Sequence, residues 1–166
     1  MLNVRLPPVN KPALLVQIIA TLSTELEMLT QAALATHAEA TDEENKSEDK
    51  YDTRGLEASY LAHGQSKAAE EVALAVTQFQ GLTMHDFQPG EPVSLGALVV
   101  LEGMTTNHYF IGPRAGGTEI VHEGRTVLVI TPQSPLGRQL VGKKQGDLVL
   151  LDLGGKRSEF RLATVA

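Results

Sequence analysis

The segment between residues 42 and 52 is unusually rich in carboxylates. Its eleven positions hold two lysines and six acidic residues, which are Asp42, Glu43, Glu44, Glu48, Asp49 and Asp52. Such a segment could be a solvated loop, or it could be a tip that presents carboxylates to a partner. The elements on either side of the segment bear on this choice.

The residues before the acidic segment are typical of one long helix. The stretch from Pro12 to about Ala40 contains no glycine and no internal proline. Asn10 can cap this helix, and Pro12 suits the first turn, where a missing N–H costs nothing. A seam with alternate steps of four and three, as in a coiled coil, runs through Leu15, Ile19, Leu22, Leu26, Leu29, Ala33 and Thr36.

A second helix is predicted from about Lys50 to Gln80. The same alternation runs through Ala58, Leu61, Gln65, Ala68, Val72, Ala75 and Phe79. Two seams of similar length with a short polar link predict an antiparallel helical hairpin. Thirty helical residues reach roughly 45 Å, so the hairpin should project and carry the acidic link at its far end.

The second half of the chain has the pattern of a small sheet. Short apolar runs separated by turn signals predict a compact and mostly antiparallel sheet, with strands near 93–101, 108–112, 125–131, 147–153 and 159–165. Ser134, Pro135 and Gly142 have the spacing of an N-cap, a first helical residue and a left-handed residue after the helix. A short helix is therefore expected between the third and fourth strands.

These patterns together predict an α+β protein. An N-terminal helical hairpin occupies residues 1–80, with its acidic tip at about 42–52. The residues 81–92, rich in glycine and proline, are a linker. The remaining residues, 93–166, form the sheet domain.

Composition excludes several functional classes. The chain has no cysteine, which excludes disulfides, thiol nucleophiles and Cys-bound zinc and favours a cytoplasmic location. The net charge of −6 argues against broad binding of naked nucleic acid. No run of about 18 apolar residues is present, so no membrane span is predicted. The five histidines lack metal-binding spacing and are expected to be exposed or half-buried.

The stretch "SPLGRQLVGKKQGDLVLL", residues 134–151, resembles the C-terminal domain of the Gre-family transcript cleavage factors of bacterial RNA polymerase. In that family a strand ending in Ser-Pro leads to a short helix, a Gly-Lys-Lys-x-Gly-Asp segment and a hydrophobic strand. The chain has these elements in the same order. The family architecture, an antiparallel coiled coil, a linker and an FKBP-like domain, would cover nearly the whole chain. The resemblance therefore implies an FKBP-like fold for residues 93–166.

The resemblance also implies a mechanism. Gre factors insert the coiled coil into the secondary channel of backtracked polymerase, where tip carboxylates help to hold a second Mg²⁺ and an attacking water. The polymerase then hydrolyses its own RNA. Mg²⁺ prefers oxygen ligands and keeps several waters, so one or two added carboxylates can change its occupancy.

The implied protein is therefore a transcription elongation factor and not an enzyme. It would bind RNA polymerase as a monomer and meet the 3′ end of the nascent RNA only indirectly. It would use the Mg²⁺ of the polymerase active site and hold no stably bound cofactor. No membrane binding and no specific DNA binding are expected.

The tip matches the family motif in either of two incomplete registers. The family reads approximately Asp-x-x-Glu-Asn, followed by a Tyr. In "NKSED", Glu48 and Asp49 fall on the Glu and the Asn, but Asn45 replaces the Asp. Alignment on Tyr51 instead places Glu44 on the Asp and loses the Glu. If the link is helical, Glu44 and Glu48 are four residues apart and could converge on one ion.

We therefore predict Glu44, Glu48 and Asp49 as the carboxylates that assist Mg²⁺, with Glu44 and Glu48 as ligands of the polymerase-bound ion. Arg54 could contact RNA phosphate, or it could pair within its own helix. Basic residues on the hairpin are sparser than in the family. The alternative function is consequently a Gre-like regulator that occupies the same channel, competes with true Gre factors and does not promote cleavage. A more distant rival is a chaperone-like or isomerase protein that uses the hairpin as an arm.

Overall fold

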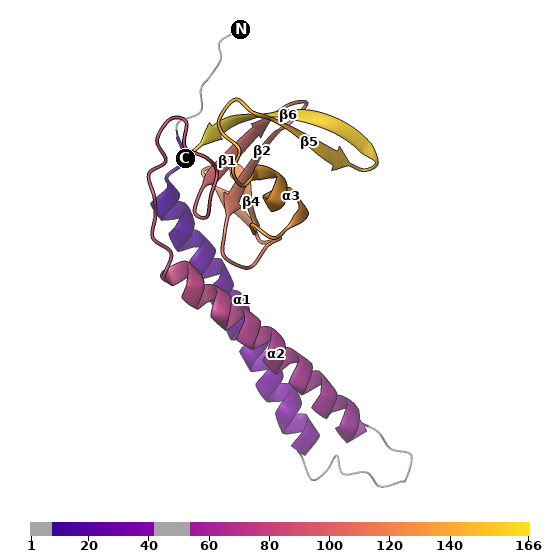
Figure 1. Cartoon of the computed structure of the whole chain (residues 1–166). Helices are drawn as coiled ribbons and strands as arrows, with labels where there is room; N and C mark the ends of the chain where they lie inside the picture. Colours follow the sequence, from indigo (N-terminus) through magenta and orange to yellow (C-terminus); the bar gives the residue numbers. More distant parts are fainter. Residues whose placement is uncertain (1–7, 42–53) are drawn as a thin grey trace. The chain divides into compact units, whose positions relative to one another are not determined.

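The computed structural model describes residues 8–41 and 54–166 and confirms the α+β class (Figure 1). Two long helices come first, and a six-stranded sheet with one short helix follows. The helices are α1 (Lys11–Thr41), α2 (Arg54–Gln80) and α3 (Pro135–Leu140). The strands are β1 (Leu98–Glu102), β2 (Thr106–Ile111), β3 (Glu119–His122), β4 (Arg125–Ile130), β5 (Leu148–Leu153) and β6 (Lys156–Val165).

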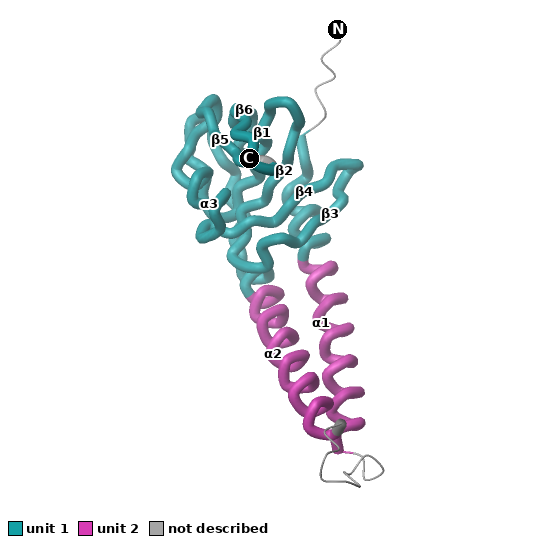
Figure 2. Tube along the Cα trace, turned by 90° about the vertical axis from the view of Figure 1, so that its right-hand side faces the viewer, with its two compact units in different colours: residues 1–18, 78–166 teal, residues 19–77 magenta. Residues whose placement is uncertain are grey.

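The chain divides into two compact units (Figure 2). The hairpin unit is residues 19–77, and the sheet unit is residues 1–18 with 78–166. The first turns of α1 and the last residues of α2 therefore belong to the sheet unit. The boundaries at residues 80 and 92 that the sequence suggests stay a prediction.

The sheet has the strand order β3-β4-β2-β1-β6-β5. Every neighbouring pair is antiparallel except β2 and β4, which are parallel. This confirms a mainly antiparallel sheet, whereas the FKBP-like fold stays a prediction. The sequence analysis missed β3, because a four-residue strand that ends at a turn is too short to show a clear alternation.

One face of the sheet carries the main hydrophobic core. Helix α3 contributes Leu140 to this core. The core has twelve buried residues: Val93, Ala97, Val99, Leu101, Tyr109, Ile111, Ile130, Leu140, Val149, Leu151, Phe160 and Leu162. Successive residues of a strand point to opposite faces. Phe110, which lies between Tyr109 and Ile111 on β2, is therefore directed to the other face.

The other face receives the C-terminal end of α2. The rings of Phe79 and Phe110 lie 6.4 Å apart, and both residues are fully buried. Gly112 makes this contact possible, because a Cβ atom there would lie 2.7 Å from Cζ of Phe79 and 2.9 Å from Cγ1 of Val129. A side chain at position 112 would push Phe79 off the sheet.

The N-terminal end of α1 is held by polar contacts within the same unit. Asn10 caps the helix as predicted, since its Oδ1 accepts from the Ala13 N–H at 3.1 Å. Lys11 is buried, and its Nζ donates to the His85 carbonyl at 2.6 Å and lies 4.8 Å from the Phe87 ring centroid. Burial lowers the pKa of Lys11, and the nearby Asp86 carboxylate partly opposes this shift.

Helix α1 is also long and apolar enough, by length and composition alone, to cross a membrane. This is weak evidence, because a core helix of a soluble protein passes the same test. The sequence-based expectation of no membrane span stays a prediction.

The short helix α3 begins and ends as the sequence predicts. Ser134 Oγ accepts from the Gly137 N–H at 3.0 Å, and Pro135 occupies the first helical position. Gly142 follows the helix with φ +88°, the left-handed conformation that favours glycine. Inside the helix, a Cβ atom at Gly137 would lie only 1.9 Å from the Thr131 carbonyl oxygen. The backbone of α3 therefore approaches the end of β4 too closely for any side chain.

Gly137 in α3 and Gly64 in α2 should respond oppositely to a methyl group. We expect Gly137→Ala to lower the free energy of unfolding by about 3 kcal/mol, because the Thr131 carbonyl must move. We expect Gly64→Ala to raise it by about 0.5–1 kcal/mol, because a Cβ atom there meets nothing within 4 Å and alanine is the better helix former. Urea unfolding of both variants measures these changes. A neutral Gly137→Ala would show that α3 does not need this close approach.

Candidate functional site

The predicted carboxylates Glu44, Glu48 and Asp49 lie outside the described residues. Their position in the chain is nevertheless bounded, because α1 ends at Thr41 and α2 begins at Arg54. The connection between these two helix ends holds all six acidic residues of the segment. The roles of the three carboxylates, and the phosphate contact of Arg54, stay predictions.

The two helices that flank this connection form the predicted hairpin. Both views show α1 and α2 side by side and running in opposite directions (Figures 1 and 2). The part of α1 in the hairpin unit, residues 19–41, is about 35 Å long at 1.5 Å per residue. The acidic connection joins Thr41 to Arg54, and these helix ends belong to the hairpin unit.

The described part of the hairpin unit is itself acidic. Residues 19–41 and 54–77 contain six glutamates and two basic residues, Arg54 and Lys67. The last turn of α1 has no basic residue, and Glu57 lies in the first turn of α2, where the helix dipole favours negative charge. Such a surface offers little to the phosphates of RNA and leaves the negative field of the tip largely uncompensated.

The seam between the helices is made mostly of small side chains. Leu22, Ala33 and Ala75 are buried, as the predicted seam requires. The prediction was wrong for Leu61, which is 57% exposed, while Ala62 beside it is only 6% exposed. A seam with steps of three and four can include either Leu61 or Ala62. The larger apolar side chain favours Leu61 when the sequence alone is considered.

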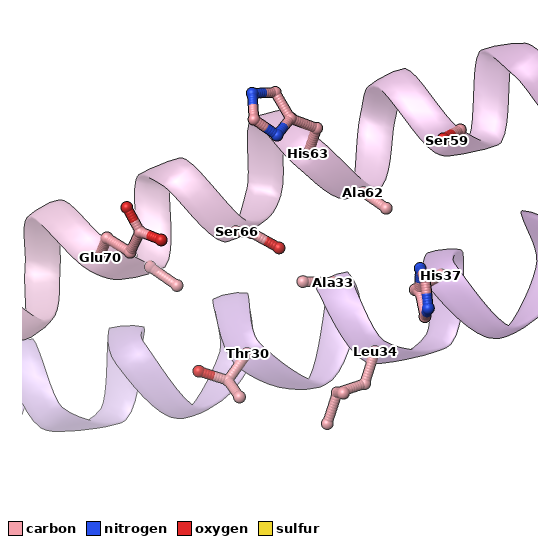
Figure 3. A pocket seen from close by; sticks show the side chains of 10 residues that line it. Thr30, Ala33, Leu34, His37, Ser59, Ala62, His63, Ser66 and Glu70 are labelled. Carbon is pink, nitrogen blue, oxygen red and sulfur yellow. The ribbon is translucent and has the colours of Figure 1, made fainter.

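A cavity of about 570 Å³ lies along this seam in the hairpin unit. Figure 3 shows Ala33 and Ala62 between the two helices, with Ser66 directed toward α1 and His63 directed away from it. The lining is completed by Thr30, Leu34, His37, Ser59, Ala69 and Glu70. Because alanine and serine fill so little of this space, packing in the middle of the hairpin contributes little to its stability.

Two polar contacts that join α1 to the sheet were not predicted. Gln17 Nε2 donates to the Val121 carbonyl at 2.7 Å, and Gln17 Oε1 lies 2.8 Å from Nδ1 of His122. Each contact joins residues more than 100 positions apart, and no local pattern in the sequence marks such a pair. Gln17 is therefore a positioning residue for α1 within the sheet unit.

Most histidines lie where the sequence analysis expects them. His37, His63 and His85 are exposed, and His108 is half-buried. The expectation was wrong for His122, which is buried beside Gln17. Among residues 8–41 and 54–166, no group of three or more histidine or acidic side chains could hold a metal ion.

No family model matches the chain, and no curated protein matches it. Among solved structures, the chain is similar to GreA factor homolog 1 (Gfh1) of Thermus thermophilus, with 20% identity and a TM-score of 0.38 over 89% of this chain and 94% of that one. The values for Gfh1 of Thermus aquaticus are 20% and 0.39, over 88% and 92%. A transcription elongation factor GreA/GreB from Nitrosomonas europaea gives 17% and 0.34, over 66% and 91%. The fold of this chain is defined by its own helices and strands and does not depend on these likenesses.

The corrected seam predicts which leucines stabilise the hairpin. Leu22→Ala should lower the free energy of unfolding by about 2–5 kcal/mol, because Leu22 is almost fully buried. Leu61→Ala should change it by no more than about 0.5 kcal/mol, because the side chain is already in water. Thermal or urea unfolding followed by far-UV circular dichroism compares the two. A larger loss for Leu61→Ala than for Leu22→Ala would restore the seam expected from the sequence.

The lowered pKa of His108 predicts how the free energy of unfolding depends on pH. Burial, and secondarily the nearby Arg125 guanidinium, lower the pKa of His108 below its ordinary value of 6.5. As the pH falls below 6.5, the unfolded chain binds a proton at this residue before the folded chain does, so the free energy of unfolding falls. His108→Gln should therefore weaken the loss of stability on acidification.

Urea unfolding at pH values above and below 6.5 measures this effect. The same substitution at His63, which lies exposed on α2, serves as the control. Equal pH dependence in the wild type and in His108→Gln would contradict the prediction.

Proposed function

We propose that this chain is a Gre-type accessory factor that binds RNA polymerase, inserts its helical hairpin into the secondary channel and stimulates cleavage of backtracked RNA. One observation carries the proposal: helices of 31 and 27 residues run antiparallel, and the short connection between them holds six carboxylates. A narrow arm with acids at its end suits delivery of carboxylates to a site inside another protein.

The family resemblance at residues 134–151 supports the same function. Its residues are those that shape α3 and the turn into β5. Ser134 caps the helix, and Gly142 ends it. The Asp147 carboxylate accepts from the Lys144 N–H at 2.8 Å and closes the turn. The residues that carry the resemblance thus have capping and turn roles in this chain.

In the proposed mechanism Glu44 and Glu48 add oxygen ligands to a weakly held Mg²⁺ of the polymerase. The ion that they would help to hold would support the attacking water, and the catalytic groups would belong to the polymerase. The factor supplies no catalytic residue of its own. A cytoplasmic location follows from this function, because the polymerase works there.

A second function is favoured by the charge of the arm. The described part of the hairpin unit has Arg54 and Lys67 as its basic residues, and an amide, Asn45, takes the place of a carboxylate in one register of the tip motif. Both features weaken the hold on displaced RNA and on Mg²⁺. The alternative is therefore a regulator that enters the channel, competes with true Gre factors and leaves the transcript intact.

Stalled, backtracked elongation complexes test the leading proposal. We expect the wild-type protein to release short 3′ RNA fragments, and we expect Glu44→Ala with Glu48→Ala to slow their release by about 10- to 100-fold, as loss of a metal-supporting group does. Glu25→Ala with Glu27→Ala is the matched control, because it removes the same charge from exposed positions of α1 within the described hairpin.

Each other outcome has a distinct meaning. Cleavage that persists in Glu44→Ala with Glu48→Ala would overturn the assignment of these two carboxylates, while the proposed stimulation of cleavage would stand. No cleavage, together with polymerase binding and suppression of a Gre factor, would establish the channel regulator. A protein that does not bind polymerase would overturn both functions.

A further inference from the structure

The sheet ends in two edge strands, β3 and β5, and these differ in how they are protected. Strand β3 has four residues, with Glu119 at its start. Its Val121 carbonyl accepts a hydrogen bond from Gln17 Nε2 at 2.7 Å, so a side chain of α1 occupies this edge. Short length, charge and a covering group are the usual devices that keep an edge from pairing with another chain.

Strand β5 is longer, with six residues, and Asp152 near its end is its one charged residue. It reads Leu-Val-Leu-Leu-Asp-Leu, without lysine, proline or glycine, and it pairs with β6 over six consecutive residues without a shift in register (Figure 1). Leu148 and Leu150 are 53% and 54% exposed. Among the residues that the structure describes, no strand pairs with its outer side. A regular and largely apolar edge that no described strand pairs with favours the addition of another strand.

The register shows which backbone groups of β5 are available. Leu162 of β6 accepts from the Gly146 N–H at 2.8 Å and donates to the Asp147 carbonyl at 2.9 Å, so its backbone groups face β5. In an antiparallel ladder, alternate residues direct these groups to the same neighbour. Phe160 and its partner Val149 therefore face each other. Leu148, Leu150 and Asp152 accordingly direct their N–H and C=O groups outward.

We propose that β5 is an interface at which two copies of this chain pair antiparallel about a two-fold axis at Val149. This register places Leu148 of one copy opposite Leu150 of the other, twice. The four outward N–H groups and C=O groups of these leucines then bond to one another, and the leucines cover each other on the outer face. Asp152 falls opposite Gly146, so no carboxylate faces a leucine.

The register with its axis at Val149 is better matched than the one with its axis at Leu150. A shift of the two-fold axis to Leu150 keeps the outward groups in phase, but it sets Asp152 opposite Leu148 and leaves that carboxylate against an apolar side chain. The self-complementary order of side chains thus favours a second copy as the occupant. This inference is an alternative to the monomer expected from the sequence, and it does not depend on the proposed function.

Sedimentation equilibrium of the full chain over a wide range of concentrations tests the proposal. We expect the mean mass to rise from 17.8 kDa toward twice that value. Leu150→Lys should hold the mass at that of the monomer, because a charged edge residue opposes strand pairing. Leu61→Lys is the matched control: it makes the same change at a leucine of similar exposure on α2, and it should leave the dimer intact.

Two further variants test the backbone contacts and the register. Leu150→Pro removes an outward N–H, which β5 does not use toward β6, and should abolish the dimer while the folded circular dichroism spectrum is kept. Because the chain has no cysteine, a mixture of Leu148→Cys and Leu150→Cys proteins should form the mixed disulfide under oxidation. A wild-type protein that stays monomeric at every concentration would overturn the proposal. A dimer that Leu150→Lys leaves unchanged would overturn it as well.

Discussion

The contact of Phe79 with the bare backbone of Gly112 is the constraint on which the sheet unit depends. It brings the ring of Phe79, at the end of α2, against Phe110 on the face of the sheet opposite the main core. Leu14 and Ile18 of α1 are fully buried in the same unit. Apolar burial therefore anchors one end of each long helix in the sheet unit. Lys11 and Gln17 add hydrogen bonds that fix where α1 begins.

Features that depend on neighbouring residues could be predicted from the sequence. The cap at Ser134, the left-handed Gly142 and the Asn10 cap of α1 each follow from local backbone chemistry, and the structure contains them. Strand β3 and the buried His122 could not be predicted in this way. Both depend on partners that the fold brings from afar, β4 for the strand and Gln17 for the histidine.

Prediction of the hairpin from the sequence also fails where a feature depends on residues that are distant in the chain. The two helices of the hairpin follow from the periodicity, but the choice between Leu61 and Ala62 depends on how the helices are rotated about their axes. Both residues satisfy a seam with steps of three and four, and only the structure shows that the alanine is the buried one. For the candidate site, the sequence gives the position of the carboxylates between two helix ends. Their coordination depends on the conformation of residues 42–53, which lie outside the description.

The cavity lined by Ala33, Ala62 and Ser66 has a consequence for how the arm fluctuates. Side chains this small leave few apolar contacts to break when the two helices open between the cavity and the tip. Parts of a protein with little buried apolar surface open with small free energies, independently of global unfolding. Amide hydrogens of α1 beyond Ala33 and of α2 before Ala62 should therefore exchange with solvent through local opening. Those near Leu14 and Phe79 should exchange only when the sheet unit itself unfolds.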